Sequence, residues 1–270
     1  DSVSNNQKNR KVCPVNEILS SNCSTGIVTN EQFPVLYYQF KNKYLNSSSY
    51  NGENTQIKTG NVVLQITDLA HQREEDSTVS YLDLGNCEEI LRKKYNISSN
   101  KSLIIYKTDI KSDDLSNTFV QYEIFHPDDL SPIKYEADCS KEKISISVPV
   151  TLNDKTKLLT DSTSNKGYNV FDSNDSFYND ICSTYTTENG TDITLNDRKN
   201  VIEESGTVVN FCQEGCEMTG FNNKTQKAIC NCFVEEKKTV YDFKDLNFSK
   251  IDFNKLIGEL KDSNYLVMKC

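Results

Sequence analysis

The sequence predicts a mainly β protein with a few short helices, in which a β-sandwich-like N-terminal domain precedes a disulfide-rich C-terminal module. Three observations lead to this fold class. Short runs of branched and aromatic residues recur between turn-forming segments in the first half, which is typical of antiparallel sheets. The composition becomes polar near residue 152, and five of the ten cysteines then lie between Cys182 and Cys232. Such clustering indicates a module held by disulfides.

The chain of 270 residues is long enough for two domains of ordinary size. We expect a polar N-terminal tail over residues 1–12, a β-sandwich-like domain over 13–151, and a disulfide-rich module over 152–270 that carries one amphipathic helix. Only 36% of the residues are hydrophobic, and tryptophan is absent. The cores should therefore be modest and should depend on covalent links.

The predicted strands of the first domain cover residues 35–40, 62–66, 79–84, 103–107, 119–125 and 144–150. The last of them alternates: Ile144, Ile146, Val148 and Val150 fall on one face, with small polar residues between them. A strand of this pattern is buried on one side. Residues 45–60 are rich in Asn, Ser, Gly and Thr, which predicts an exposed loop.

Two helices are predicted from apolar spacing and end charges. The first covers residues 86–96, with Asn86 as its cap, acidic residues in its first turn and basic residues in its last. The second covers residues 252–261, with Asp252 as its cap, and a short strand over 265–268 follows it.

All ten cysteines are expected to form disulfides, since their number is even: Cys13, Cys23, Cys87, Cys139, Cys182, Cys212, Cys216, Cys230, Cys232 and Cys270. We expect Cys13 and Cys23 to close a short loop, and Cys87 and Cys139 to tie the first helix to a later loop. The spacings C-x3-C and C-x-C do not match the pairs of a structural zinc site. No C-x-x-C redox motif occurs.

The segment from Cys182 onward resembles growth-factor-like modules, because a C-x-C step follows an earlier group of cysteines. The resemblance implies pairing of first with third, second with fourth and fifth with sixth. It would give Cys182–Cys216, Cys212–Cys230 and Cys232–Cys270. The 29 residues between Cys182 and Cys212 exceed the length found in a standard module of this kind.

Charge and hydropathy restrict the partners. A net charge of −9 and a pI near 4.9 argue against nucleic acid and against docking on an anionic membrane. No apolar run approaches the length of a spanning helix, so direct membrane insertion is not expected. The polar residues 1–11 lack the apolar core of a signal peptide. We therefore expect a secreted chain or an ectodomain from which a signal has been removed, outside the cell or at its surface, and leave open whether an anchor or further repeats come after Cys270.

Eight N-x-S/T sequons are present, at Asn22, Asn46, Asn96, Asn100, Asn174, Asn189, Asn223 and Asn247. In an oxidising compartment some of them should carry N-linked glycans. Asn22 is a poor acceptor because it adjoins Cys23, whereas Asn189 lies in a favourable Asn-Gly-Thr turn.

Catalysis is not expected. The only histidines are His71 and His126, and neither has an oriented partner that the sequence reveals. No nucleophile elbow, phosphate-binding loop or zinc-protease motif occurs. The sequence therefore shows no oriented general base and no catalytic motif, and we do not expect the protein to be an enzyme.

A weak calcium site is predicted in the segment 171–180. Asp172, Asn174, Asp175 and Asp180 supply the oxygen ligands that Ca²⁺ prefers. The order of an EF-hand loop is absent, however, and Asp and Asn also favour turns for backbone reasons. Apart from calcium, we expect no metal and no other cofactor.

Longer segments carry a second resemblance, notably FYNDICSTYTTENGTDITLNDRKN around Cys182 and FCQEGCEMTGFNNKTQKAICNC at the end of the cysteine cluster. From about Tyr81 to Cys232 the chain resembles a cysteine-rich extracellular unit that recurs in large surface proteins of free-living protists. The resemblance implies surface exposure and a structural or adhesive role, and it supplies no activity.

These features favour a secreted, glycosylated structural protein that acts as a protomer of an extracellular filament or surface coat. Its partners would be copies of itself in a homopolymer, or other extracellular glycoproteins. The alternative is an adhesin or receptor ectodomain of a protist cell-surface protein. A membrane-spanning helix after Cys270 would favour that alternative.

Overall fold

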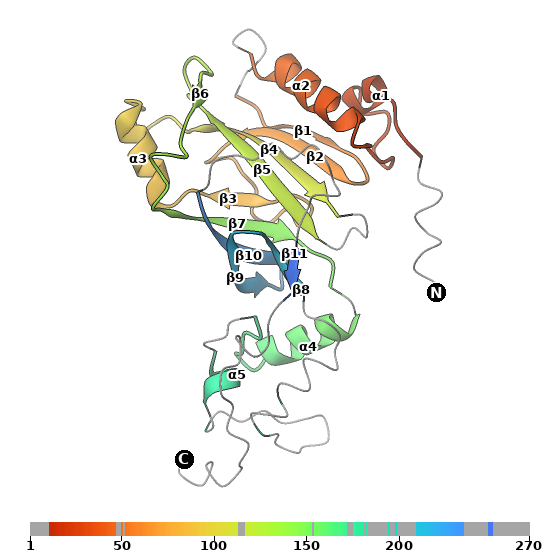
Figure 1. Cartoon of the computed structure of the whole chain (residues 1–270), viewed down its shortest axis with the longest axis vertical. Helices are drawn as coiled ribbons and strands as arrows, with labels where there is room; N and C mark the ends of the chain where they lie inside the picture. Colours follow the sequence, from red (N-terminus) through yellow and green to blue (C-terminus); the bar gives the residue numbers. More distant parts are fainter. Residues whose placement is uncertain are drawn as a thin grey trace.

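The computed structural model describes residues 11–46, 50, 52–112, 117–152, 154–171, 175–180, 182, 194, 198, 209–234 and 248–250. Two antiparallel sheets, stacked face to face, form the centre of this part of the molecule (Figure 1). Within it, no helix is both long enough and apolar enough to cross a membrane. The predicted fold class, mainly β with few short helices, is confirmed.

The five-stranded sheet has the order β1-β2-β4-β5-β6. Its strands are β1 (Thr55–Lys58), β2 (Val62–Asp68), β4 (Ile104–Lys111), β5 (Thr118–Phe125) and β6 (Pro132–Ile133). The four-stranded sheet has the order β3-β7-β10-β9, with β3 (Tyr81–Asp83), β7 (Lys143–Pro149), β10 (Lys227–Phe233) and β9 (Cys216–Asn222). Strands β8 (Val209–Gln213) and β11 (Phe248–Lys250) pair with each other.

Side chains of β4 alternate between the two faces of the five-stranded sheet, and each face contributes to a separate hydrophobic core. Ile104 and Tyr106 pack with α1 (Val15–Leu19) and α2 (Gln32–Tyr44), which cover the outer face. Ile105 belongs to the core between the two sheets. Successive side chains of a strand point to opposite faces, so a strand that is buried on both sides must be apolar or paired at nearly every position.

The strand predicted for residues 35–40 is wrong, because this segment lies within α2. Phe33, Leu36, Tyr37 and Phe40 are buried at intervals of three, one and three residues, which places them on one face of a helix. Aromatic residues favour strands in isolation, but here the helical spacing decides the structure.

Other elements differ from the prediction in detail. Asn86 does not cap α3 (Asn86–Lys94), because the cap position is occupied by Gly85, whose positive φ of 51° is one that glycine adopts readily. Strand β1 lies in the segment that was predicted to be a loop. The helices α4 (Asp154–Ser164) and α5 (Ser176–Asn179) were not predicted. The expected helix at 252–261 and the strand at 265–268 lie outside the described residues.

The expected domain boundary at residue 152 runs through one sheet. Strand β7 precedes this residue and β10 follows it, yet the two pair over seven residues, from Lys143 opposite Phe233 to Pro149 opposite Lys227. The core between the sheets likewise contains residues from Leu82 to Val234. The sandwich therefore needs strands from both predicted domains.

Among the residues that the structure describes, four disulfides join Cys13 to Cys23, Cys87 to Cys139, Cys212 to Cys230 and Cys216 to Cys232. The first three agree with the expected pairs. An ideal Cβ on Gly26 would overlap Sγ of Cys13, so the first disulfide requires a glycine there.

The pairs Cys182–Cys216 and Cys232–Cys270, implied by the growth-factor-like order, are wrong. The register of β9 with β10 places Cys216 directly opposite Cys232, with 4.1 Å between the Cα atoms. This separation brings the two thiols within reach of each other. Cys182 is disulfide-bonded, but its partner lies outside the described residues, as does Cys270.

Candidate functional sites

Each of the two histidines lies in a turn that follows a strand of the five-stranded sheet, His71 after β2 and His126 after β5. Nδ1 of His71 lies 2.7 Å from Oδ2 of Asp68, so a carboxylate does orient this ring, which the sequence did not reveal. The His71 side chain is nevertheless 75% exposed. Nδ1 of His126 lies 3.2 Å from the backbone nitrogen of Asp128, in the turn that follows β5. These contacts organise turns at the surface.

The residues predicted to bind calcium are only partly described. Asp175 accepts hydrogen bonds from the backbone nitrogens of Phe177 (2.8 Å) and Asn169 (2.9 Å), and so caps α5. Asp180 accepts one from Cys182 at 2.9 Å. Both carboxylates thus have a structural role in turns. Asp172 and Asn174 lie outside the described residues, and calcium binding there stays a prediction.

The described sequons differ in how far their side chains are engaged. Asn22, Asn96 and Asn100 are exposed. Asn46 donates from Nδ2 to the backbone oxygen of Asn42 at 2.8 Å. Asn223 donates from Nδ2 to Oγ of Ser164 at 2.7 Å, and its Oδ1 is buried. Asn174, Asn189 and Asn247 lie outside the described residues.

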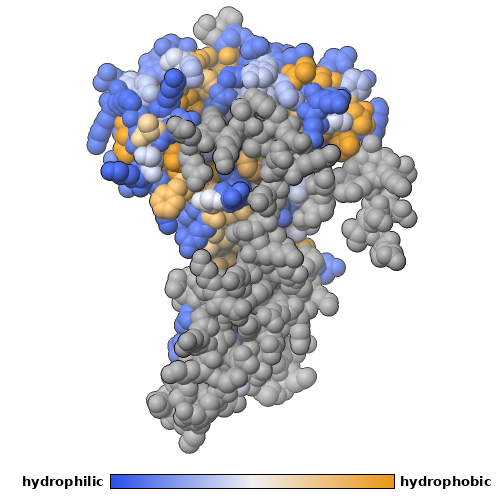
Figure 2. All heavy atoms as spheres, viewed as in Figure 1, coloured by the Kyte–Doolittle hydropathy of each residue, from blue (hydrophilic) through white to orange (hydrophobic). Residues whose placement is uncertain are grey.

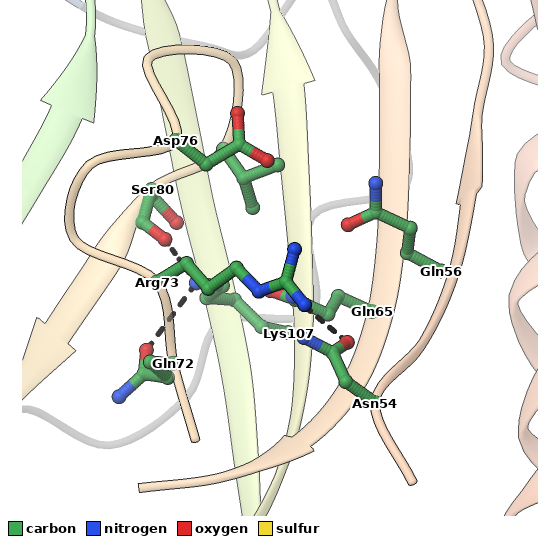
Figure 3. Close-up of a pocket in the computed structure, with 9 residues that line it drawn as sticks. Asn54, Gln56, Gln65, Gln72, Arg73, Asp76, Ser80 and Lys107 are labelled. Atoms are coloured by element: carbon green, nitrogen blue, oxygen red, sulfur yellow. Dashed lines mark hydrogen bonds between the residues drawn. The ribbon is translucent and has the colours of Figure 1, made fainter. Parts of the chain in front are cut away.

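A polar pocket of about 160 Å³ lies between strands β1, β2 and β4 and the loop 69–80, which leads from β2 to β3 (Figure 3). Four amide side chains line it: Asn54, Gln56, Gln65 and Gln72. Arg73, Asp76 and Lys107 add three charged groups, and Ser80 and Val79 complete the lining. We refer to this site as the polar pocket.

Two residues that lie opposite each other on neighbouring strands form the floor of the polar pocket. Gln65 of β2 is paired with Lys107 of β4, and both side chains lie on the sheet face away from α2. Nε2 of Gln65 donates to Oδ1 of Asn54 at 3.1 Å. Oε1 of Gln65 is buried and has no hydrogen-bond partner among the described residues. A buried acceptor without a donor costs about 1–3 kcal/mol, unless a water molecule or a ligand supplies one.

Lys107 is only 1% exposed. Its Nζ donates to the backbone oxygen of Ser80 and, at 3.4 Å, to Oε1 of Gln72. Burial lowers the pKa of Lys107 to about 8, although the nearby carboxylate of Asp109 favours the charged form. A buried ammonium in a polar pocket is a strong donor to any anion that enters it.

Side chains also fix the loop over the pocket. Asp109 accepts hydrogen bonds from the backbone nitrogen and from Oγ of Ser80, each at 2.6 Å. Gln72 donates to the backbone oxygen of Leu82 at 2.8 Å and accepts from its nitrogen at 3.0 Å. The pocket is therefore held in shape by buried hydrogen bonds on two sides.

The lining of the polar pocket contains the cations Arg73 and Lys107 and the anion Asp76, and the carboxylate of Asp109 lies close to Lys107 behind the lining. Arg73 is exposed, and its guanidinium has no hydrogen-bond or ion-pair partner in the part of the chain that the structure describes. Burial opposes the charge on Asp76, but hydrogen bonds from Thr78 outweigh it and lower the pKa of Asp76.

The sequence analysis missed this pocket, although one signal was present. Lys107 and Asp109 lie two residues apart in an apolar run, so they share one face of a strand. Two charges on one face of a buried strand indicate a polar site between the layers. Gln65 and Arg73 gave no such signal, because only the sheet register brings them beside Lys107.

A second feature is the free edge of the four-stranded sheet. Among the strands that the structure describes, β9 pairs with β10 alone within this sheet. Thr219 is the extra residue of a bulge, because Met218 lies opposite Cys230 and Gly220 opposite Ile229.

On the face seen in Figure 2, hydrophilic side chains predominate over the sheets and the apolar ones form separate patches.

Comparisons with models of protein families, with curated proteins and with solved structures found no match to this chain.

Proposed function

We propose that the protein works outside the cell as a disulfide-stapled protomer, which joins copies of itself into a filament or surface coat by strand addition at β9. The observation that carries the proposal is the seven-residue β9, whose outer edge has no partner strand in the described part of the sheet. An edge strand presents unpaired N–H and C=O groups, which are a template for another strand.

Two properties of β9 suit it to this role. Disulfide Cys216–Cys232 ties it directly to its neighbour β10, so the edge is ordered before any partner arrives and less conformational entropy is lost on association. The strand also lacks Lys and Pro, the residues that often protect free edges, and Glu217 is its only charge.

A contact between β9 and a different surface of the next copy would be head-to-tail. Such contacts do not close and therefore build filaments. Disulfides are compatible with an extracellular protein, and N-linked glycans on exposed sequons such as Asn96 would fit the same location. The resemblance to surface proteins of protists points in the same direction.

The test is electron microscopy of the native, unreduced protein at physiological salt, beside the variant Thr219→Pro. Thr219 has no Cα partner in β10, and proline is tolerated at bulges of edge strands, so Thr219→Pro should fold while its ring obstructs a strand that approaches this edge. We expect fibrils or sheets from the native protein, and dispersed particles from Thr219→Pro.

The matched control is Thr219→Ala, which loses the same hydrogen bond from Oγ1 to the backbone oxygen of Ile229 but introduces no ring, and it should still assemble. Dispersed particles from the native protein would contradict the proposal. Fibrils from Thr219→Pro that equal those of the native protein would show that β9 is not the contact.

The second candidate function is that of an adhesin or receptor ectodomain, and the polar pocket is the observation that favours it. Its hydrogen-bonded walls and unpartnered donors are typical of sites that recognise a small polar ligand. Dispersed native particles, together with saturable binding of a ligand in this pocket, would support it over the assembly.

A further inference from the structure

We propose that the polar pocket binds a monosaccharide-sized ligand that carries both hydroxyl groups and a carboxylate, such as a sugar acid. The proposal is independent of assembly at β9, because none of the residues that line the pocket belongs to that strand.

The positive groups determine the charge of the ligand. Arg73 offers a guanidinium that has no partner among the described residues, and its planar fork matches the geometry of a carboxylate. Lys107 uses two of its three N–H donors on Ser80 and Gln72, which leaves the third for a ligand. Asp76 and Asp109 offset part of this positive charge, so the unpartnered guanidinium of Arg73 is the group that favours an anion.

The hydrogen-bond acceptors in the polar pocket determine which other groups the ligand should carry. Gln65 is 5% exposed, and its Oε1 has no donor among the described residues. The exposed Asn54 covers this amide through a single hydrogen bond to Nε2. If Asn54 turns aside, a ligand hydroxyl can donate to Oε1, and another hydroxyl can donate to Asp76. A hydroxyl group both donates and accepts, so it suits a wall of amides better than a carboxylate alone does.

The size and the lining of the polar pocket argue against large, apolar or aromatic ligands. A cavity volume of about 160 Å³ is well below that of a drug-sized site, so the ligand should be small. Val79 is the only apolar side chain in the lining, so an apolar or aromatic ligand would lose hydrogen bonds to water without replacing them. An acetate ion has no hydroxyl group that could donate to Oε1 of Gln65.

The experiment is isothermal titration calorimetry of the full-length, disulfide-intact protein at pH 7 and low salt. The probes are glucuronate, glucose, acetate and inorganic phosphate. We expect glucuronate to bind at least tenfold more tightly than each of the other three. An absence of binding by glucuronate at millimolar concentration would overturn the proposal, as would equal binding by glucose, acetate or phosphate.

Two variants test whether glucuronate binds in the polar pocket. Arg73→Gln removes an exposed charge, so it should fold normally and should bind glucuronate at least tenfold more weakly. Lys141→Gln removes a comparable exposed charge from a turn that is not part of the pocket, and it should bind as the native protein does. Unchanged affinity in Arg73→Gln, or equal losses in both variants, would contradict the assignment.

A third variant tests the acceptor. Gln65→Met keeps the length of the side chain but removes its hydrogen-bonding groups, and it should also weaken glucuronate binding at least tenfold. Circular dichroism and thermal unfolding would establish that this variant is folded. Native affinity in the folded variant would overturn the role of Gln65. Thr219→Pro should bind glucuronate normally, which separates this proposal from the one on assembly.

Discussion

Lys107 couples the electrostatics of the polar pocket to the stability of the fold. It lies between the two sheets, where burial disfavours its charged form, and its pKa falls from 10.5 to about 8. Asp109 and Asp76 favour the charge, whereas Lys227 of β10 opposes it. Above pH 8 the folded protein therefore loses a proton from this group, while the unfolded chain keeps it until about pH 10.5.

This difference in proton binding predicts a pH dependence of stability. Between pH 8 and 10.5 the unfolded state binds more protons at Lys107, so the free energy of unfolding should rise with pH, by up to about 3 kcal/mol. We expect the native protein to gain stability relative to Lys107→Met over this interval, as measured by urea unfolding with the disulfides intact.

The comparison with Lys107→Met removes the effect of the buried tyrosines. Burial raises the pKa of Tyr106, which destabilises the fold above pH 10 in both proteins equally. Lys141→Met, which replaces an exposed lysine, should show no such pH-dependent difference. A constant difference between the native protein and Lys107→Met from pH 7 to 10.5 would contradict the prediction.

The sequons give a second prediction at the scale of the residue. In a eukaryotic host, Asn96 should carry a glycan because its side chain is exposed in a turn. Asn223 should be bare, because its amide bonds Ser164 and the hydroxyl of Thr225 is buried. Glycopeptide mass spectrometry measures both. Asn96→Gln should lose the mass of one glycan and Asn223→Gln should lose none; the opposite pattern would refute the argument from exposure.

At the scale of the element, α2 is held by aromatic side chains on one face. Phe40 and Tyr37 pack on Tyr106 of β4, with ring centroids 5.8 and 4.7 Å apart. The hydroxyl of Tyr106 donates to the backbone oxygen of Tyr37 at 3.0 Å. The helix therefore depends on the outer face of the five-stranded sheet for its position.

Truncation of a buried aromatic side chain on this face of α2 should lower the free energy of unfolding. Phe40→Ala removes a fully buried ring, and we expect a loss of about 3–5 kcal/mol in the free energy of unfolding. Tyr38→Ala removes an aromatic ring from the same helix that is 50% exposed, and it should cost less than about 1 kcal/mol. Chemical denaturation measures both. Similar losses in the two variants would mean that α2 does not dock as described.

At the scale of the whole molecule, the two sheets form one folding unit that spans the predicted boundary at residue 152. Ile146 and Val148 of β7 face a core to which β10 contributes Ala228 and Cys230. Without β9 and β10, the four-stranded sheet would retain only β3 and β7. A sheet of two strands has little stability by itself.

A fragment of residues 11–151 should therefore not fold, whereas a fragment of residues 11–234 should. The dispersion of amide resonances in NMR spectra distinguishes the two outcomes, and the longer fragment serves as the control. A well-dispersed spectrum from the shorter fragment would restore the boundary at residue 152 and would refute the single unit.

The sequence by itself determined the properties that depend on near neighbours. The alternation of Ile144, Ile146 and Val148 predicted a half-buried strand, because side chains two residues apart share a face. The apolar runs predicted β2, β4 and β5 of one sheet and β3 and β7 of the other, but not β1, β6, β9 or β10. The cysteine count predicted a fold held by disulfides. Where two local signals conflicted, as in α2, the preference of aromatic residues for strands gave the wrong element.

Only the tertiary structure decided which distant residues meet. The pairing of β7 with β10 joins the two halves of the chain, and the register of β9 with β10 selects Cys216–Cys232 over the pairs that spacing suggested. The polar pocket likewise exists because the sheet register sets Gln65 beside Lys107 and the loop brings Arg73 over them. Contacts of this kind depend on strand order and register, which alternation along a single strand does not encode.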